Sequence, residues 1–484
     1  MVDQIRNFIN GEYVDGVGTF DDINPVDGSL AAQVHTADKG VVDRAVKAAR
    51  DALNGPWGSM STPERVAILR RIADRIEERF DDLLAAEIRD TGKPVELAKT
   101  LDVYRASANF RSFTDTAASA GLDAFITEPA NGSNALMYAV RKPLGVVGVI
   151  VPWNLPLLLL TWKVAPALAT GNTVVVKPSE ETPASAALLG EIMAEAGLPD
   201  GVYNVVHGYG DTGALITTHP DVDGVTFTGE SKTGSAIQKA VSDRVLPVSF
   251  ELGGKNAALV FEDANIEETV AGLTHSLFTN SGQVCLCTER VYIQRPVFDE
   301  VVAGLKESAQ KLKIGTPYEE GTQFGPLISA KHREKVHGYA RLAKEHGAET
   351  IIGGEIPDMP EELAGGSWYT PTLWTGLEHT DQVMREEVFG PVAGLIPFDT
   401  EEEAVRMAND TEYGLASAIW TTNLERAHRV APKMNVGLSW VNTWYLRDLR
   451  APFGGSGLSG IGREGGVHSF DFYTEPVNVA IKLA

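Results

Sequence analysis

Cysteine is nearly absent from this chain of 484 residues, which contains only Cys285 and Cys287. Two cysteines two positions apart cannot build a disulfide framework, and no second half exists elsewhere to complete a zinc site. The sequence therefore excludes a disulfide-stabilised fold, predicts no metal site and fits a reducing compartment, the cytoplasm. Residues 1–10 have neither a basic flank nor an apolar run, so no export signal is expected.

An excess of positive charge is also lacking. The chain has 42 Lys and Arg residues against 65 Asp and Glu residues, which leaves a formal net charge of −23. Such a surface repels phosphate backbones and anionic lipid headgroups, so neither a nucleic acid nor a membrane is expected as a partner. The length and the 43% content of hydrophobic residues are sufficient for two or three domains, each with a substantial core.

A long apolar run able to cross a membrane is missing as well, although residues 143–162 contain no charged residue. Pro152 and Pro156 lie in the middle of this stretch, where they would break a helix and lipid would offer no replacement hydrogen bonds. The segment is predicted to form a buried strand, a turn and the start of a buried helix.

Short β-branched runs separated by helix-length intervals begin at Gly145. They are Val146–Val151, Thr173–Val176, Val202–Val206, Gly224–Phe227 and Pro247–Phe250. This alternation predicts a parallel sheet with crossover helices, in a doubly wound domain that binds ligands at the carboxyl ends of its strands. Upstream of it, the sequence predicts a hairpin turning at Asn10-Gly11, a helix at Val42–Leu53 and a further helical segment at Glu64–Ile88 that Gly92 closes.

A second α/β pattern begins near Asn256, with strands expected at Ala257–Phe261 and Arg290–Ile293. The predicted fold is therefore α/β, with two doubly wound parallel-sheet domains plus a small β element. The first domain is assigned to residues 1–120 and 142–250, the second to 251–440 and the β element to 121–141 and 468–484. The strand-like segments Asn134–Val140 and Pro476–Leu483 in this element are expected to pair across a subunit boundary.

Glycine patterns suggest a nucleotide site. Gly208, Gly210 and Gly213 form a G-x-G-x-x-G after a predicted strand, as in a dinucleotide fingerprint, but no acidic ribose partner is clearly placed about 20 residues later. Glycines in a strand-to-helix turn also often serve only the backbone. The segment 227–234, which contains Gly229, is a second candidate to present helix amides to a phosphate.

Seven motifs indicate whether these glycine segments belong to a nucleotide-binding protein. They are Pro152-Trp-Asn154, Lys177-Pro-Ser-Glu180, Phe227-Thr-Gly229, Glu251-Leu-Gly-Gly-Lys255, Gly282-Gln-Val-Cys285, Glu387-Val-Phe-Gly-Pro391 and Pro452-Phe-Gly-Gly455. In this order they resemble the aldehyde dehydrogenase superfamily from end to end. Residues 440–450 and 460–468 resemble its 2-hydroxymuconic semialdehyde dehydrogenase branch.

The resemblance implies catalytic roles for residues that, taken alone, would also fit ordinary structural roles. Cys285 becomes a nucleophile rather than a small buried hydrophobe, because sulfur adds to a carbonyl and later leaves from a thioester. Asn154 on its own could be a turn residue, but the resemblance makes it an oxyanion donor together with the backbone N–H of Cys285. Glu251 on its own could be an exposed glutamate at a strand end, but the resemblance makes it the general base. Lys163 and Glu464 match a pair that relays protons from this base, although either also fits an ordinary surface charge.

The resemblance further implies NAD as the cofactor. Lys177 and Glu180 match residues that bind the adenosine ribose, where a carboxylate would repel the additional phosphate of NADP. Glu387 and Phe389 match residues that hold the nicotinamide ribose and ring. The remaining expected cofactor contacts are Pro152, Trp153, Gly210 and Gly229. Glu230 departs from the Ser common in relatives and is expected to point away from the pyrophosphate, because a carboxylate facing it would be unfavourable.

The branch resemblance implies a semialdehyde that carries a carboxylate, and a protein of this negative charge needs a local cation to bind it. Arg447 and Arg111 are the candidates, although Arg447 is adjacent to Asp448 and Arg111 could pair with a surface acid. Alternative substrates are 2-aminomuconic semialdehyde, betaine aldehyde and aliphatic aldehydes. A catalytically silent structural or binding relative is the alternative of another class, and the intact Cys285, Glu251 and Asn154 argue against it. Relatives imply a homodimer or homotetramer.

Overall fold

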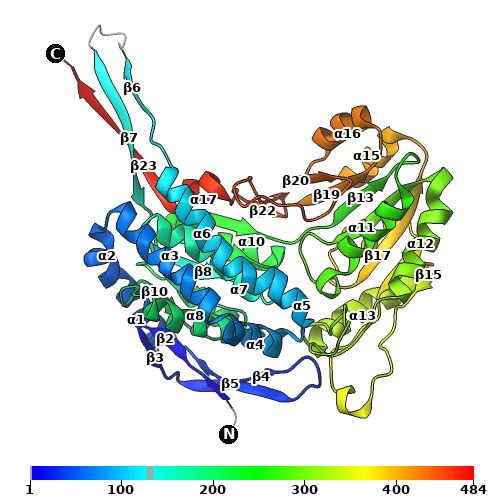
Figure 1. Ribbon diagram of the computed structural model, residues 1–484, viewed down its shortest axis with the longest axis horizontal. Helices are drawn as coiled ribbons and strands as arrows, with labels where there is room; N and C mark the ends of the chain where they lie inside the picture. The colour runs from blue at the N-terminus through cyan, green and yellow to red at the C-terminus, as the bar shows by residue number, and fades with distance from the viewer. Residues whose placement is uncertain (1–2, 128–133, 484) are drawn as a thin grey trace.

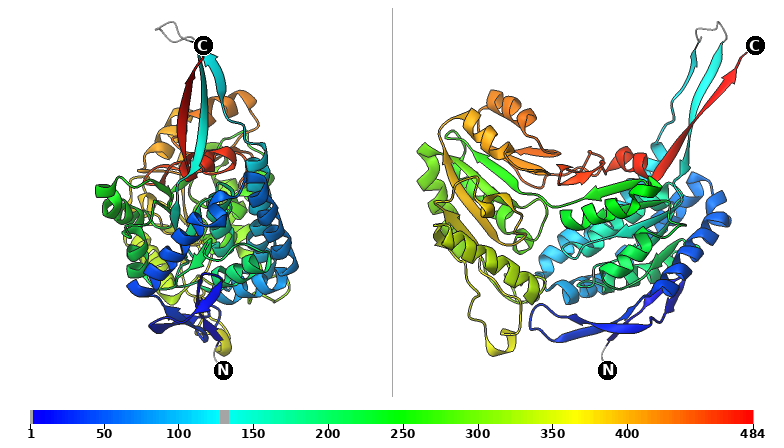
Figure 2. Two further views of the ribbon diagram at one scale, coloured as in Figure 1. Left: turned by 90° about the vertical axis from the view of Figure 1, so that its left-hand side faces the viewer. Right: turned by 180° about the vertical axis from the view of Figure 1, so that it is seen from behind.

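The computed structural model describes residues 3–127 and 134–483. Two α/β domains lie side by side, and a narrow arm of strands projects from the first (Figure 1). The C-terminus lies near the end of the arm and the N-terminus at the opposite end of the molecule, as the two further views also show (Figure 2).

The first domain is built on an eight-stranded sheet in the order β22-β12-β11-β8-β9-β10-β2-β3. Its strands are β2 (Asn7–Ile9), β3 (Glu12–Val14), β8 (Val146–Ile150), β9 (Thr173–Lys177), β10 (Tyr203–Val205), β11 (Gly224–Thr228), β12 (Val248–Glu251) and β22 (Gly460–Ile461). The five strands predicted from the β-branched runs are present and mutually parallel. The hairpin at Asn10-Gly11 is also confirmed, and both turn residues have positive φ.

Helices cover both faces of this sheet. They are α1 (Lys39–Asn54), α3 (Thr62–Glu78), α4 (Phe80–Thr91), α6 (Tyr104–Ser119), α7 (Pro156–Ala169), α8 (Ala184–Glu195), α9 (Gly210–Thr217) and α10 (Ser231–Val241). One apolar core joins α3, α6, α7 and α8 to the sheet, and a second joins α1, α9 and α10 to it. Short segments α2 (Pro56–Ser59), α5 (Val95–Leu97) and a π-helical turn, η1 (Ala98–Val103), connect these helices.

The prediction of one continuous helical segment over residues 64–88 is wrong, because two helices, α3 and α4, occupy this stretch. Arg79 breaks it, with φ −98° and ψ 24°, where the guanidinium donates to the carboxylates of Asp82 and Glu195. Gly92 ends α4 in the left-handed conformation, as predicted.

The uncharged stretch 143–162 forms β8, a turn and the first part of α7, whose residues are all buried. Among residues 3–127 and 134–483, no helix has both the length and the apolar character that crossing a membrane requires.

The second domain has a seven-stranded sheet in the order β15-β16-β17-β14-β13-β19-β20, parallel except for β15. Its strands are β13 (Asn256–Val260), β14 (Thr288–Gln294), β15 (Glu349–Ile352), β16 (Thr372–Thr375), β17 (Val392–Phe398), β19 (Ala416–Trp420) and β20 (Leu438–Val441). Its main helices are α11 (Ile266–Phe278), α12 (Phe298–Gln310), α13 (Ala330–Glu345), α15 (Glu401–Asn409) and α16 (Leu424–Val430). Separate apolar cores on its two faces make this sheet doubly wound too.

The arm consists of β6 (Ala124–Thr127), β7 (Ala135–Pro143) and β23 (Thr474–Lys482). The predicted strand segments 134–140 and 476–483 pair with each other inside one chain, with Val477 opposite Val140, because β23 returns antiparallel along the whole of β7. Pairing of these segments across a subunit boundary stays a prediction. Apolar side chains of the arm remain exposed, among them Phe125, Ile126 and Ile481.

Candidate active site

The site lies where the two sheets face each other. Glu251 ends β12 at the carboxyl edge of the first sheet, and the loop 252–255 leads directly into β13 at the amino edge of the second. Cys285 precedes β14 and Phe389 precedes β17 at that same amino edge. The crossing from one domain to the other therefore brings three of the predicted functional segments together.

The loop before Cys285 has an unusual backbone. Asn280, Ser281 and Gly282 all have positive φ, and a Cβ on Gly282 would lie 2.1 Å from the carbonyl oxygen of Gly390. The side chain of Asn256 donates to the carbonyl oxygens of Cys285 at 2.7 Å and Cys287 at 2.8 Å. These bonds fix the position of the predicted nucleophile against the first strand of the second domain.

Both thiols are held in the protonated form. Burial, followed by the charges of Glu251 and Glu387, raises the pKa of Cys285 to about 12. Cys285 lines a cavity, whereas Cys287 is buried and directs its Sγ to the carbonyl oxygen of Thr279 at 3.7 Å. The geometry favours Cys285 as the reactive thiol, and its proton must leave as it attacks.

Asn154, the predicted oxyanion donor, lines the same cavity. Its side-chain amide donates to the carbonyl oxygen of Gln283 at 3.0 Å. The backbone oxygen of Asn154 accepts 3.0 Å hydrogen bonds from Lys93 Nζ and from the Asn280 amide. The sequence analysis missed Lys93, which is buried in an ion pair with Asp102. A buried lysine shortly after a helix-ending glycine was the available signal.

Glu251 is fully enclosed, and neither of its carboxylate oxygens has a hydrogen-bond partner within the described chain. Burial and the neighbouring Glu464 carboxylate raise the pKa of Glu251 well above its ordinary value, although Lys163 opposes this. Lys163 Nζ lies 2.8 Å from Glu464 Oε1 and 2.9 Å from Thr226 Oγ1, with all three side chains buried. Lys163 and Glu464 are therefore not surface charges.

A cavity of about 600 Å³ is lined by residues of both domains, Cys285 among them. All the predicted cofactor residues contribute to its lining, namely Pro152, Trp153, Lys177, Glu180, Gly210, Gly229, Glu387 and Phe389. Lys177 Nζ and Glu180 Oε2 are 3.4 Å apart at one end of the cavity. Near Cys285, the ring of Trp153 packs edge-on against the ring of Phe389, with 5.4 Å between the two ring centres. This arrangement fits an extended dinucleotide, with Glu180 offering acceptors to ribose hydroxyls. Glu230, at the amino end of α10, is exposed and also contributes to the lining.

Arg111 is the predicted site residue that the structure does not bring to Cys285. It lies on the surface, with 42% of its side chain exposed, and pairs with Asp74 at 2.8 Å and Glu77 at 2.9 Å on α3. These two acids account for its charge, so the assignment of Arg111 to the substrate is corrected.

Arg447 instead faces inward. Its guanidinium lies 3.9 Å from the ring centre of Phe453 and 5.1 Å from that of Trp162, and its Nη2 is buried without a partner in the described residues. Asp448 does not compete for it, because that carboxylate pairs with Arg450.

Arg105, which the sequence analysis missed, approaches the same indole. It lies one helical turn and a half before Arg111 on α6, with its Cζ 5.7 Å from the Trp162 ring centre and its Nε buried without a partner in the described chain. Burial and the charge of Arg447 lower the pKa of Arg105 to about 10. Two converging guanidinium groups with unused donors mark a place for an anion.

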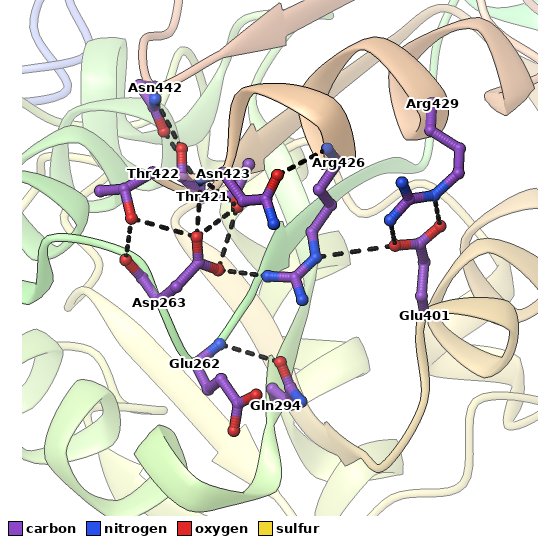
Figure 3. Close-up of polar contacts among 10 residues, drawn as sticks. All are labelled: Glu262, Asp263, Gln294, Glu401, Thr421, Thr422, Asn423, Arg426, Arg429 and Asn442. Atoms are coloured by element: carbon purple, nitrogen blue, oxygen red, sulfur yellow. Dashed lines mark hydrogen bonds and ion pairs between the residues drawn. The ribbon is translucent and has the colours of Figure 1, made fainter.

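The carboxyl edge of the second sheet, where a doubly wound fold would ordinarily bind a ligand, is closed instead (Figure 3). Asp263, just after β13, accepts hydrogen bonds from Thr421 Oγ1 at 2.7 Å and Asn423 N at 2.8 Å, and it pairs with Arg426. Arg429 forms a two-bond ion pair with Glu401 beside it. The charges satisfy one another, so this edge serves stability.

Replacing Asp263 with Ala is expected to lower the free energy of unfolding by about 2 kcal/mol, because several bonds to one charged group are lost. Burial favours the protonated acid, but hydrogen bonds from Thr421 and Thr422 and the charge of Arg426 prevail and hold the pKa of Asp263 below its usual value. The stabilisation is therefore present above the unfolded pKa and fades as the pH falls through the folded one.

Urea unfolding of the wild type and the Asp263→Ala variant, repeated from neutral to acid pH, measures this difference. Asp51→Ala is the matched control, because among the described residues Asp51 forms only an exposed helix-surface pair with Lys47. An effect of Asp263→Ala no larger than that of the control, or one independent of pH, would contradict the assignment.

Residues 13–479 match the aldehyde dehydrogenase family. A 2-hydroxymuconic semialdehyde dehydrogenase of Pseudomonas sp. (strain CF600) is 57% identical, over 99% of this chain and 100% of that one. A 2-aminomuconic 6-semialdehyde dehydrogenase of Pseudomonas sp. is 56% identical, over 99% and 98%. The NAD⁺ complex of an aldehyde dehydrogenase from Bacillus cereus superposes with a TM-score of 0.95 at 38% identity, over 100% and 97%.

Proposed function

Because the chain belongs to the aldehyde dehydrogenase family and is an NAD-dependent oxidoreductase, we propose that it oxidises a carboxylate-bearing semialdehyde through a thioester on Cys285. We propose 2-hydroxymuconic semialdehyde as the substrate. The observation that carries this is the pair Arg105 and Arg447, whose buried, unused donors converge on Trp162 near the catalytic groups.

The chemistry begins when the thiol of Cys285 loses its proton to solvent through the cavity that it lines. Sγ then adds to the aldehyde carbon, which converts the carbonyl oxygen into an oxyanion. The Asn154 amide and the backbone N–H of Cys285 stabilise that charge. When bound beside Cys285, NAD would supply the hydride acceptor that oxidation of this adduct to a thioester requires. Glu251 then removes a proton from the water that attacks the thioester, and the C–S bond breaks to release the carboxylic acid and the Cys285 thiolate, which leaves the proton on Glu251.

The proton taken by Glu251 needs a route out of a closed site. Glu464 and Lys163 are the charged groups that most affect the pKa of Glu251. We assign the Lys163–Glu464 pair to this relay, since a proton that moves from Glu251 to Glu464 changes only which of the two carboxylates balances the charge of Lys163.

Arg447 acts on both catalytic groups as well as on the substrate. Its positive charge opposes the rise in the pKa of Cys285 and of Glu251. A carboxylate between Arg105 and Arg447 would find bidentate donors and relieve the repulsion between the two guanidinium groups.

The same pocket fits 2-aminomuconic semialdehyde, which differs from the hydroxy compound at one heteroatom, and the two Pseudomonas relatives are almost equally similar. Betaine aldehyde is disfavoured because its ammonium group would meet two guanidinium groups. An aliphatic aldehyde would leave both arginines unpaired. A catalytically silent role is disfavoured by the open position of Cys285 in the cavity.

Arg447→Ala and Arg105→Ala are each expected to lower kcat/KM for 2-hydroxymuconic semialdehyde about 100-fold, mainly by raising KM, because a buried charge pair loses one partner. With hexanal, Arg105→Ala should keep most of the wild-type kcat/KM. Arg447→Ala should lose less with hexanal than with the semialdehyde, because only its effect on the pKa of Cys285 and Glu251 is then lost. NADH formation at fixed NAD measures this, with Arg111→Ala on the same helix as the matched control. Equal losses on both aldehydes, or a loss in Arg111→Ala, would contradict the assignment.

Two further proposals concern the assembly and location of the enzyme. The exposed apolar side chains of the arm support its role in a homodimer or homotetramer. The scarcity of cysteine and the negative charge support a cytoplasmic location.

A further inference from the structure

Glu289 is a buried carboxylate that the proposed chemistry does not use. It lies on β14, shortly after Cys285, and only 4% of the residue is exposed. Its Oε2 lies 2.5 Å from Lys255 Nζ in an ion pair that is buried on both sides. Lys255 ends the loop that begins at Glu251, so this pair ties the segment of the general base to that of the nucleophile.

The same carboxylate also binds a third segment. Glu289 Oε2 accepts a hydrogen bond from the backbone N–H of Val388 at 3.0 Å, and Oε1 accepts one from that of Phe389 at 2.8 Å. Phe389 has φ +61°, a left-handed conformation that is unfavourable for an aromatic residue. Two adjacent N–H groups in such a turn form an anion-binding concavity, and here the anion is the side chain of Glu289.

The turn matters because it carries Glu387 and Phe389 into the cavity. Glu387 Oε1 accepts a 2.8 Å hydrogen bond from the N–H of Gly254, and a Cβ on Gly253 would lie 1.9 Å from Glu387 Oε2. The position of this carboxylate is therefore set by two contacts. One is the loop 253–254, and the other is the backbone turn that Glu289 holds.

We propose that Glu289 is a positioning residue for the nicotinamide end of the cofactor site. Paired with Lys255, it holds the strained turn 387–389 so that Glu387 and Phe389 face the space beside Cys285. The inference rests on the proposed roles of Glu387 and Phe389, and it gives Glu289 no direct contact with cofactor or substrate. The adenosine end, at Lys177 and Glu180, does not depend on this turn.

The test compares binding of NAD with binding of ADP-ribose, which lacks the nicotinamide, by quenching of tryptophan fluorescence; Trp153 lies in the cavity wall. In Glu289→Gln the affinity for NAD should fall about tenfold, the equivalent of a lost charge-assisted hydrogen bond. The affinity for ADP-ribose should stay at the wild-type value. Turnover should fall about 10- to 100-fold, since small misplacement of a reacting group has effects of that size.

Removing Glu289 alone leaves Lys255 buried without a partner and can prevent folding. The double variant Lys255→Gln/Glu289→Gln removes both charges and should show the same selective loss of NAD affinity. Glu401→Gln, which breaks an ion pair in the closed edge of the second sheet, is the control and should change neither affinity. Equal weakening of NAD and ADP-ribose, or no weakening of either, would overturn the inference.

Glu387→Gln is measured in parallel to separate two kinds of failure. If it weakens NAD selectively and the Glu289 variants do not, the inference about Glu289 is wrong and the proposed cofactor site stands. If Glu387→Gln also leaves the NAD to ADP-ribose ratio unchanged, the assignment of the nicotinamide end is wrong and the inference falls with it.

Discussion

Cys285→Ala is expected to lose at least about 10⁴-fold in kcat for aldehyde oxidation, because without the thiol no covalent adduct forms. NAD binding should be retained, since Cys285 is only one of the many residues that line the cavity. The measurement is NADH formation with 2-hydroxymuconic semialdehyde, alongside a fluorescence titration with NAD.

Cys287→Ala is the matched control. Cys287 is buried and packs within the first domain's apolar core, so its loss should affect stability more than turnover. Comparable loss of activity in both variants, or substantial activity in Cys285→Ala, would contradict the identification of the nucleophile.

Glu251→Gln is expected to lower kcat about 10²- to 10⁴-fold while leaving a burst of NADH equal to the number of active sites. The amide cannot accept the proton of the hydrolytic water, so the enzyme should stop at the thioester. Rapid mixing of enzyme, NAD and aldehyde, followed at the absorbance of NADH, separates the burst from the steady state.

The pH dependence follows from the same residue. Burial and Glu464 raise the pKa of Glu251 well above its ordinary value, so more of the carboxyl is ionised, and able to act as a base, as the pH rises. The steady-state rate of the wild type should therefore increase into the alkaline range, and this increase should be absent from Glu251→Gln. An equal pH dependence in both proteins would contradict the role of Glu251 as the base.

Much of the fold could be predicted from the sequence because the strands are short, β-branched and buried on both faces. Val146–Val151 and Thr173–Val176 were recognisable for this reason, and their order along the chain made a parallel sheet the expected arrangement. The break at Arg79 was not predictable, because the periodicity of apolar residues continues through it. At the break Arg79 donates to Glu195 of α8, a contact between segments far apart in sequence that no local pattern indicates.

The residues of the site also divide into those that the sequence could predict and those that it could not. Cys285, Glu251 and Asn154 stand in motifs that can be read locally. The structure places Cys285 and Asn154 in the lining of one cavity, and Glu251 close enough for its charge to affect the pKa of Cys285. Local motifs could not show which of the arginines faces the site. Arg111 and Arg105 lie on one helix, and which of them faces Trp162 depends on the π-helical turn before it and on the acids of α3. The contacts of Lys93 and Glu289 join segments far apart in sequence.

The most direct test of the central claim is mass spectrometry of Glu251→Gln after incubation with NAD and 2-hydroxymuconic semialdehyde. The account predicts one acyl group per subunit, located on the peptide at Cys285 and dependent on both NAD and the aldehyde. NADH formation without an adduct, or an adduct on Cys287, would contradict catalysis through a Cys285 thioester.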